Sequence, residues 1–237
     1  FCQGGSVLLT ANTGSSYLWS NGATTQSITV SATGNFSVTV TQAGGCTDVS
    51  ASTAVTVNQL PVADITANGA TTFCDGNSVV LTATPGNSWL WSNGASTQSI
   101  TISTTGNYSV TVTGIGGCTA TSSPRSVTVN ANPPALINAN GTTTFCDGGN
   151  VILTASTGNS YLWSNGATTQ SITVNASGNF TVAVTQNGGC ISNSTTTAVT
   201  VNPNPAADIS ASGATSFCQG NNVILTASAG NSWLWSN

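Results

Sequence analysis

Residues 17–30 read YLWSNGATTQSITV, and close copies of this stretch begin at residues 89 and 161. The Asn-Gly pair after the tryptophan favours a tight turn between two strands, because both residue types tolerate positive φ. The segment that follows, SITV at residues 27–30, alternates polar and apolar side chains. Alternation with a period of two and β-branched residues predicts half-buried strands on both sides of the turn.

The cysteines define a repeat of 72 residues. They stand alternately 44 and 28 residues apart, at Cys2, Cys46, Cys74, Cys118, Cys146, Cys190 and Cys218. The first cysteine of each repeat lies in the motif F-C-[QD]-G, and the second ends the motif G-G-C. A period of 72 exceeds the roughly 20–50 residues of solenoid repeats, and a unit of this length can bury a core of its own. The sequence therefore predicts separate small domains in tandem.

Proline-containing links mark the predicted domain boundaries. Each link follows a strand-like V-T-V-N and begins at residue 59, 131 or 203. Short links of this kind are semi-rigid, so we expect a stiff array. Both ends of the sequence fall inside a module, and we expect it to be a piece of a longer array. The predicted modules are residues 1–58, which lack an initial strand, then 59–130 and 131–202, and the start of a truncated fourth module at 203–237.

The fold class predicted from these patterns is all-β. Six or seven short strands per module, with no helical periodicity, are typical of an antiparallel β-sandwich. We therefore predict a tandem array of small antiparallel β-sandwich domains with one disulfide each.

The order of motifs in a module also resembles a known group of repeats. YLWSNGATTQSITV at residues 17–30, GNFSVTVT at 34–41 and GGC at 44–46 resemble PKD-like or immunoglobulin-like repeats of very long Bacteroidota surface proteins. The resemblance covers every full module and implies an extracellular array, often exported by the type IX route. Standard PKD domains carry D-F-G-D-G after the tryptophan, whereas this chain has S-N-G-A, so roles of those acidic residues do not carry over.

The cysteine spacing leaves two pairing schemes. We favour a disulfide inside each module, because it closes each domain by itself and is worth about 4 kcal/mol for a loop of this length. The alternative is pairing across the 28-residue gap, which would clip neighbouring modules together. Either scheme implies an oxidising compartment, so we predict an extracellular or cell-surface location. The favoured pairs are Cys2–Cys46, Cys74–Cys118 and Cys146–Cys190, with Cys218 bonded to a cysteine beyond residue 237.

The composition argues against catalysis and against several classes of partner. Only 3% of residues are charged, Arg125 is the one cation, and the 237 residues contain no His, Lys or Glu. General acid–base chemistry and serine activation lack their usual groups, so we predict a protein that is not an enzyme and has no catalytic residue and no cofactor. Nucleic acids and anionic membranes are bound through basic patches, so we predict no nucleic-acid partner and no membrane insertion in this segment. No apolar run approaches the roughly 20 residues of a membrane helix.

Three sets of residues have both a functional and a structural interpretation. Asp64, Asp75, Asp147 and Asp208 could bind calcium, but one or two carboxylates per junction are few for a Ca²⁺ ion, so we favour turns or caps and no metal site. The aromatic pairs could form a sugar platform, but we favour a core tryptophan packed near the disulfide. These pairs are Tyr17/Trp19, Trp89/Trp91, Tyr161/Trp163 and Trp233/Trp235.

Six N-x-[ST] sequons offer glycosylation sites. Three of them occupy one module position, and a turn asparagine beside a Thr-rich strand is the structural alternative. We favour covalent glycans on asparagine or on the Ser/Thr clusters, because this surface has few charges to keep it solvated. The sequons begin at Asn35, Asn107, Asn140, Asn175, Asn179 and Asn193.

These inferences predict a structural role: a repeat segment of an extracellular or cell-surface fibre or stalk. The alternative function is that of an adhesin, whose repeats contact glycans or other cells. Copies of the same chain are possible partners along or beside the fibre, and strand edges without lysine gatekeepers favour edge-to-edge pairing beside it.

Overall fold

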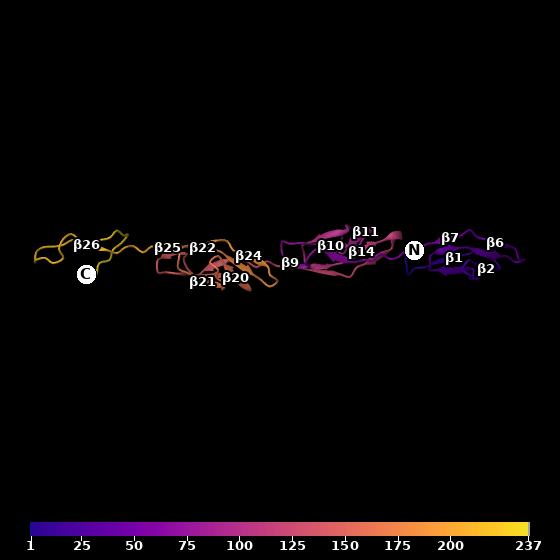
Figure 1. Cartoon of the computed structure of the whole chain (residues 1–237), viewed down its shortest axis with the longest axis horizontal. Helices are drawn as coiled ribbons and strands as arrows, with labels where there is room; N and C mark the ends of the chain where they lie inside the picture. The colour runs from indigo at the N-terminus through magenta and orange to yellow at the C-terminus, as the bar shows by residue number, and fades with distance from the viewer. Residues whose placement is uncertain (237) are drawn as a thin grey trace. The chain divides into compact units, whose positions relative to one another are not determined.

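The computed structural model describes residues 1–236 and has an all-β fold, as predicted. Among these residues, the only helical segment is a 3₁₀ turn at Ile115–Gly117. The chain divides into two compact units, Phe1–Ala131 and Asn132–Asn237. Each unit is described by itself below, with the strand labels of Figure 1.

Residues 59–130 show the complete arrangement of strands. One layer contains β8 (Ile65–Ala67), β10 (Val79–Ala83) and β12 (Ser99–Ile102), with β10 in the centre and both neighbours antiparallel to it. Leu81 is paired with Ile100 on one side and Ala67 on the other. Alternate residues of β10 are buried, which is the period of two that the sequence predicts.

The second layer consists of two three-stranded sheets, and the chain passes from one sheet to the other without a loop. The first has the order β11 (Ser88–Trp91), β14 (Val110–Thr113), β15 (Thr119–Thr121). The second has the order β13 (Gly106–Tyr108), β16 (Arg125–Asn130), β9 (Thr72–Cys74), in which β9 runs parallel to β16. Only Ser109 separates β13 from β14, so one extended segment passes from the second sheet into the first.

Serine hydroxyls fill the breaks between these two sheets. The Ser92 Oγ accepts a hydrogen bond from the Ser109 backbone N–H at 3.2 Å, and the Ser122 Oγ accepts one from the Val110 N–H at 3.1 Å. Ser122 is buried. A buried backbone N–H without a partner would destabilise the fold by about 1–3 kcal/mol, so the Ser122 hydroxyl allows the segment to change sheets without that loss at Val110.

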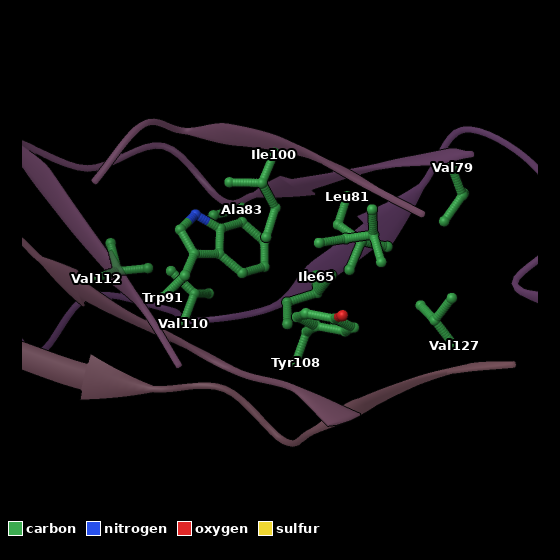
Figure 2. Close-up of a cluster of buried hydrophobic side chains, with 11 residues drawn as sticks. Ile65, Val79, Leu81, Ala83, Trp91, Ile100, Tyr108, Val110, Val112 and Val127 are labelled. Carbon is green, nitrogen blue, oxygen red and sulfur yellow. The ribbon is translucent and has the colours of Figure 1, made fainter. Parts of the chain in front are cut away.

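The core lies between the two layers and is centred on Trp91 (Figure 2). Trp91 is 2% exposed, and its indole Nε1–H donates to the Thr97 carbonyl oxygen at 2.8 Å. Leu81, Val110 and Val112 are fully buried around it. The WSNG turn therefore places the large apolar ring inside the sandwich while its one polar group is satisfied.

Gly86 is a position where this packing tolerates no side chain. A Cβ at Gly86 would overlap Cγ1 of Val112 and lie 3.0 Å from the Thr113 carbonyl oxygen. We expect Gly86→Ala to lower the free energy of unfolding of this module by about 1–3 kcal/mol, because backbone and core must both shift. Gly69→Ala is the matched control, since nothing lies within 4 Å of a Cβ there. Equal denaturation midpoints for the two variants would contradict this account.

Residues 1–58 repeat this arrangement without a counterpart of β8. As a result β1 pairs only with β3, and Leu9 is half-buried where Leu81 is fully buried. The buried core is again built around a tryptophan, Trp19. The strands are β1 (Val7–Thr10), β2 (Ser16–Trp19), β3 (Ser27–Val30), β4 (Gly34–Phe36), β5 (Val38–Thr41), β6 (Thr47–Val49) and β7 (Thr53–Val55).

The second unit begins with a third sandwich, whose core surrounds Trp163. Its strands are β17 (Ile137–Ala139), β18 (Thr144–Cys146), β19 (Val151–Ala155), β20 (Ser160–Trp163), β21 (Ser171–Val174), β22 (Gly178–Phe180), β23 (Val182–Thr185), β24 (Ile191–Asn193) and β25 (Thr197–Asn202). The described residues after position 202 contain the antiparallel pair β26 (Ile209–Ala211) and β27 (Leu225–Ala227).

Candidate functional site at the junction between two modules

A disulfide joins the first sandwich to the second within the first unit. It links Cys2 to Cys118, with the two Cα atoms 5.5 Å apart and a sequence separation of 116. Cys2 belongs to residues 1–58 and Cys118 to residues 59–130. The covalent bond is therefore between modules, and the predicted disulfide inside each module is wrong for these two cysteines.

The strand register explains why Cys2 and Cys46 do not meet. The segment that contains β4 and β5 runs from Gly34, which is paired with Val55, to Thr41, which is paired with Thr47. Cys2 is paired with Asn58 near the first end, whereas Cys46 precedes Thr47 at the second. Eight residues of strand span about 25 Å, and a disulfide needs Cα atoms within about 7 Å. The two cysteines of one module thus lie at opposite ends of the sandwich.

The direction of the chain brings the observed pair together. The first module ends at Asn58, beside Cys2. The chain then enters the second module at Ile65, which is paired with Ala83, and a short loop leads from there to Ser88, paired with Thr113. Thr113 is in turn paired with Thr119, directly after Cys118. The link between modules therefore joins the Phe-Cys end of one sandwich to the Gly-Gly-Cys end of the next.

The two ends are in close contact around the disulfide. The Sγ atom of Cys118 lies 3.9 Å from the Asn58 carbonyl oxygen. A Cβ on Gly116 would overlap the Asn58 side chain, and one on Gly114 would lie 3.2 Å from Pro61. Gly116 also has a φ of +69°, which glycine adopts at no steric cost. The G-G-C motif thus provides a turn without side chains, against which the end of the preceding module packs.

The remaining cysteines depart from the predicted pairs as well. Cys74 and Cys190 are disulfide-bonded, while Cys46 and Cys146 are free in the described structure. Cys74 is not bonded to Cys118, whose partner is Cys2, and Cys190 is not bonded to Cys146. The alternative scheme is not observed either, because it would join Cys118 to Cys146. Cys218 is free, and the partner predicted for it lies beyond residue 237.

The sequence contains one signal for the observed pairing. Each G-G-C follows the segment V-[TA]-V-T after two further residues, and each F-C-[QD]-G precedes the apolar segment V-[LVI]-L-T. In an antiparallel sandwich these two positions fall at opposite ends. A disulfide is therefore possible between the first cysteine of one module and the second cysteine of the next, which are 116 positions apart.

The aromatic pairs form part of the cores and not a surface platform. Trp19, Trp91 and Trp163 are at most 5% exposed. Their half-buried partners are held by hydrogen bonds: the Tyr17 and Tyr161 hydroxyls each accept one from a glycine N–H, and the Trp89 Nε1–H donates to the Thr84 carbonyl oxygen. The predicted core position is confirmed for these tryptophans, although the disulfide is at the module end. Trp233 and Trp235 are 57% and 42% exposed.

Most of the aspartates cap their own backbone. The Oδ1 atoms of Asp64, Asp75 and Asp147 each accept a hydrogen bond from the next residue's backbone N–H, at 2.8–3.1 Å. This matches the turn or cap role that the sequence favours. Within the described part of the chain, no three His, Cys, Asp or Glu side chains gather into a group that could hold a metal ion.

All six sequon asparagines are exposed. Asn35, Asn107 and Asn179 occupy the middle of equivalent strands, β4, β13 and β22. Asn107 accepts a hydrogen bond from the Ser126 hydroxyl at 2.6 Å, and Asn140 accepts one from the Ile152 N–H at 2.8 Å. Among the described residues, no helix has the length and apolar character needed to cross a membrane.

Comparison with known proteins gives only distant similarities. No protein-family model matches the chain, and no characterised protein matches it in sequence. A solved structure from a 1.5-MDa bacterial ice-binding adhesin is 18% identical, with 85% of this chain and 92% of that chain covered and a TM-score of 0.35. Fibronectin(III)-like modules of Clostridium thermocellum CbhA are 13% identical over 58% and 93% of the two chains, with a TM-score of 0.32. The four N-terminal Ig domains of Dscam1 isoform 6.9 are 12% identical over 85% and 70%, with a TM-score of 0.29.

Proposed function

We propose that this segment is a structural repeat region of an extracellular or cell-surface fibre or stalk. The observation that carries the proposal is the Cys2–Cys118 disulfide, which joins consecutive modules by a second covalent connection besides the peptide chain. A connection of this kind adds little to a binding site or a catalytic centre. It limits how far two neighbouring modules can separate or rotate, and this restriction is useful in a load-bearing or spacing element.

The position of the disulfide also changes the path of a stretching force. Tension applied at Phe1 passes from Cys2 directly to Cys118. The residues from 3 to 117, which include the whole core of the first module and most of the second, lie in a closed covalent loop outside that path. The first sandwich is thus shielded from unfolding under load for as long as the disulfide is intact, whereas β15 and β16 of the second sandwich remain in the path.

The surface chemistry fits a location outside the cell. Disulfides persist in oxidising compartments, and a chain with 3% charged residues relies on hydroxyl and amide groups for solvation. We propose that the exposed sequons, from Asn35 to Asn193, carry glycans that add to this solvation. Intact-mass measurement of the native protein before and after N-glycosidase treatment tests this, and an unmodified mass at all six sites would contradict it.

Electron microscopy of the oxidised chain tests the fibre proposal. We expect extended particles in which the modules follow one another in a line, because each junction is held by a short proline-containing link and, at the first junction, a disulfide. Compact particles, in which modules fold back on one another, would contradict the proposed role. The reduced chain is the control, in which the first junction should show a wider range of bends.

A second candidate function is that of an adhesin, and one observation favours it. Leu18, Leu90 and Leu162 occupy the same position in successive modules and are 55%, 59% and 57% exposed. Each lies on the outer face of its sheet, between two inward-facing aromatic residues. A recurring apolar side chain of this kind suits contact with another cell's surface proteins. Unchanged cell binding after replacing all three leucines with serine would exclude this use.

A further inference from the structure

We propose that the Gly-Gly-Cys end of the first module, residues 42–47 with Cys46, is a covalent docking surface for the Phe-Cys end of another module of the same kind. The inference rests on the equivalent Gly-Gly-Cys end of the second module, where Cys118 is already bonded to Cys2 of the first module. It adds to the proposed fibre a defined attachment surface, and its test measures thiol accessibility, which is independent of whether the chain forms a fibre.

Corresponding positions of the two modules differ in whether another module covers them. Cys118 is completely buried, and the Asn58 side chain packs against Gly116. Their equivalents 72 residues earlier are Cys46 and Gly44. Cys46 is exposed and free, and nothing lies within 4 Å of a Cβ built on Gly44. The same turn is therefore covered and bonded in one module and bare in the other.

The chemistry of the occupant follows from the covered junction. At the covered turn of the second module, Cys118 is bonded to Cys2, which forms a parallel bridge with Asn58, the last residue of the first module. The Asn58 carbonyl oxygen also contacts the Cys118 Sγ atom. The partner of Cys46 is accordingly a Phe-Cys strand beside a V-T-V-N end. Joining it to Cys46 forms one S–S bond, and the two thiol protons and two electrons pass to a thiol–disulfide oxidant such as oxidised glutathione.

The 72-residue period supplies a matched partner for the experiment. Residues 73–144 fused directly before Phe1 preserve the repeat, and they place a Phe-Cys cysteine 116 positions before Cys46. The fused block also contains the sequence of β17, Ile137–Ala139, which can pair with the open edge of β1. In a glutathione redox buffer, we expect Cys46 to become resistant to iodoacetamide and to form a disulfide with the first cysteine of the block. With Cys46→Ser in the same fusion, the first cysteine of the block should remain free and react with iodoacetamide.

The proposal fails if Cys46 of the fusion remains alkylated at the rate seen in the 237-residue chain, or if it bonds to Cys2. A second measurement does not depend on the folding of the fusion. In the 237-residue chain carrying Cys2→Ser, Cys118 has no disulfide partner but should remain covered by the first module. We expect its alkylation to be at least about tenfold slower than that of Cys46, which corresponds to about 1.4 kcal/mol of protection. Equal rates would show that the surface has no affinity for a preceding module and would overturn the inference.

Discussion

Stretched from its two ends, the oxidised chain will reach a final contour length at least about 400 Å shorter than that of the reduced chain. The Cys2–Cys118 disulfide encloses residues 3–117, and an extended chain spans at most about 3.5 Å per residue. In a Cys74→Ser background, which lacks the disulfide that Cys74 forms, those residues cannot contribute to the length while the Cys2–Cys118 bond is intact. Single-molecule force spectroscopy with and without reductant measures the difference directly.

Two variants separate this result from a disulfide inside each module. Cys118→Ser opens the loop and should lengthen the oxidised chain, whereas Cys46→Ser should leave its length unchanged because Cys46 is free. Pairing of Cys2 with Cys46 would instead make the second substitution lengthen the chain as well. A difference between the two variants is therefore the informative observation, even though both bond arrangements shorten the wild-type chain.

Replacing the central tryptophan of the second module will remove a large share of that module's stability. Truncating a fully buried tryptophan to alanine lowers the free energy of unfolding by about 3–5 kcal/mol, and a domain of 72 residues is stable by only about 4–11 kcal/mol. Trp91 is 2% exposed and hydrogen-bonded through its indole N–H. We expect the Trp91→Ala chain to lose hydrogen-exchange protection across β10 and β14, while the strands of the third sandwich keep theirs.

Leu90→Ala is the control for this substitution. Leu90 is adjacent in sequence but 59% exposed on the opposite face of β11, so its loss should change stability by no more than about 0.5 kcal/mol. Protection of the β10 and β14 amides that is unchanged in Trp91→Ala would contradict the position of the core.

The strands and the core could be predicted from the sequence because they depend on local patterns. The alternation around the WSNG turn determines which side chains share a face, and Trp91, Leu81 and Val110 are on the buried faces that it predicts. The same periodicity excludes helices. These features need no knowledge of how distant segments are placed, so the residue pattern was sufficient for the fold class.

The disulfide pairing could not be obtained in this way, because it depends on which end of the sandwich each cysteine occupies. That requires the register of β4 with β7 and of β5 with β6, together with the parallel contact between Cys2 and Asn58. The shift between sheets at Ser109, stabilised by the Ser92 and Ser122 hydroxyls, was hidden for the same reason. Serine in a Ser/Thr-rich chain gives no local indication of such a role.

The pairing also changes the physical role of the disulfide. A bond inside each module would stabilise that module by restricting its unfolded chain. The first module has no such bond, since Cys46 is free and Cys2 is bonded to the second module. Each sandwich therefore relies on its tryptophan-centred core for stability, while the disulfide restricts the junction.

The most direct test of the intermodule disulfide is peptide mapping of the unreduced chain after cleavage before aspartate. Cleavage at Asp48, Asp75 and Asp147 places Cys2 and Cys46 in residues 1–47 and places Cys118 and Cys146 in residues 75–146. We predict that these two fragments are recovered as one covalent species, and that they remain joined in the Cys46→Ser variant. Recovery of residues 1–47 without a partner, together with residues 64–74 joined to residues 75–146, would show that each module closes its own disulfide and would contradict the account.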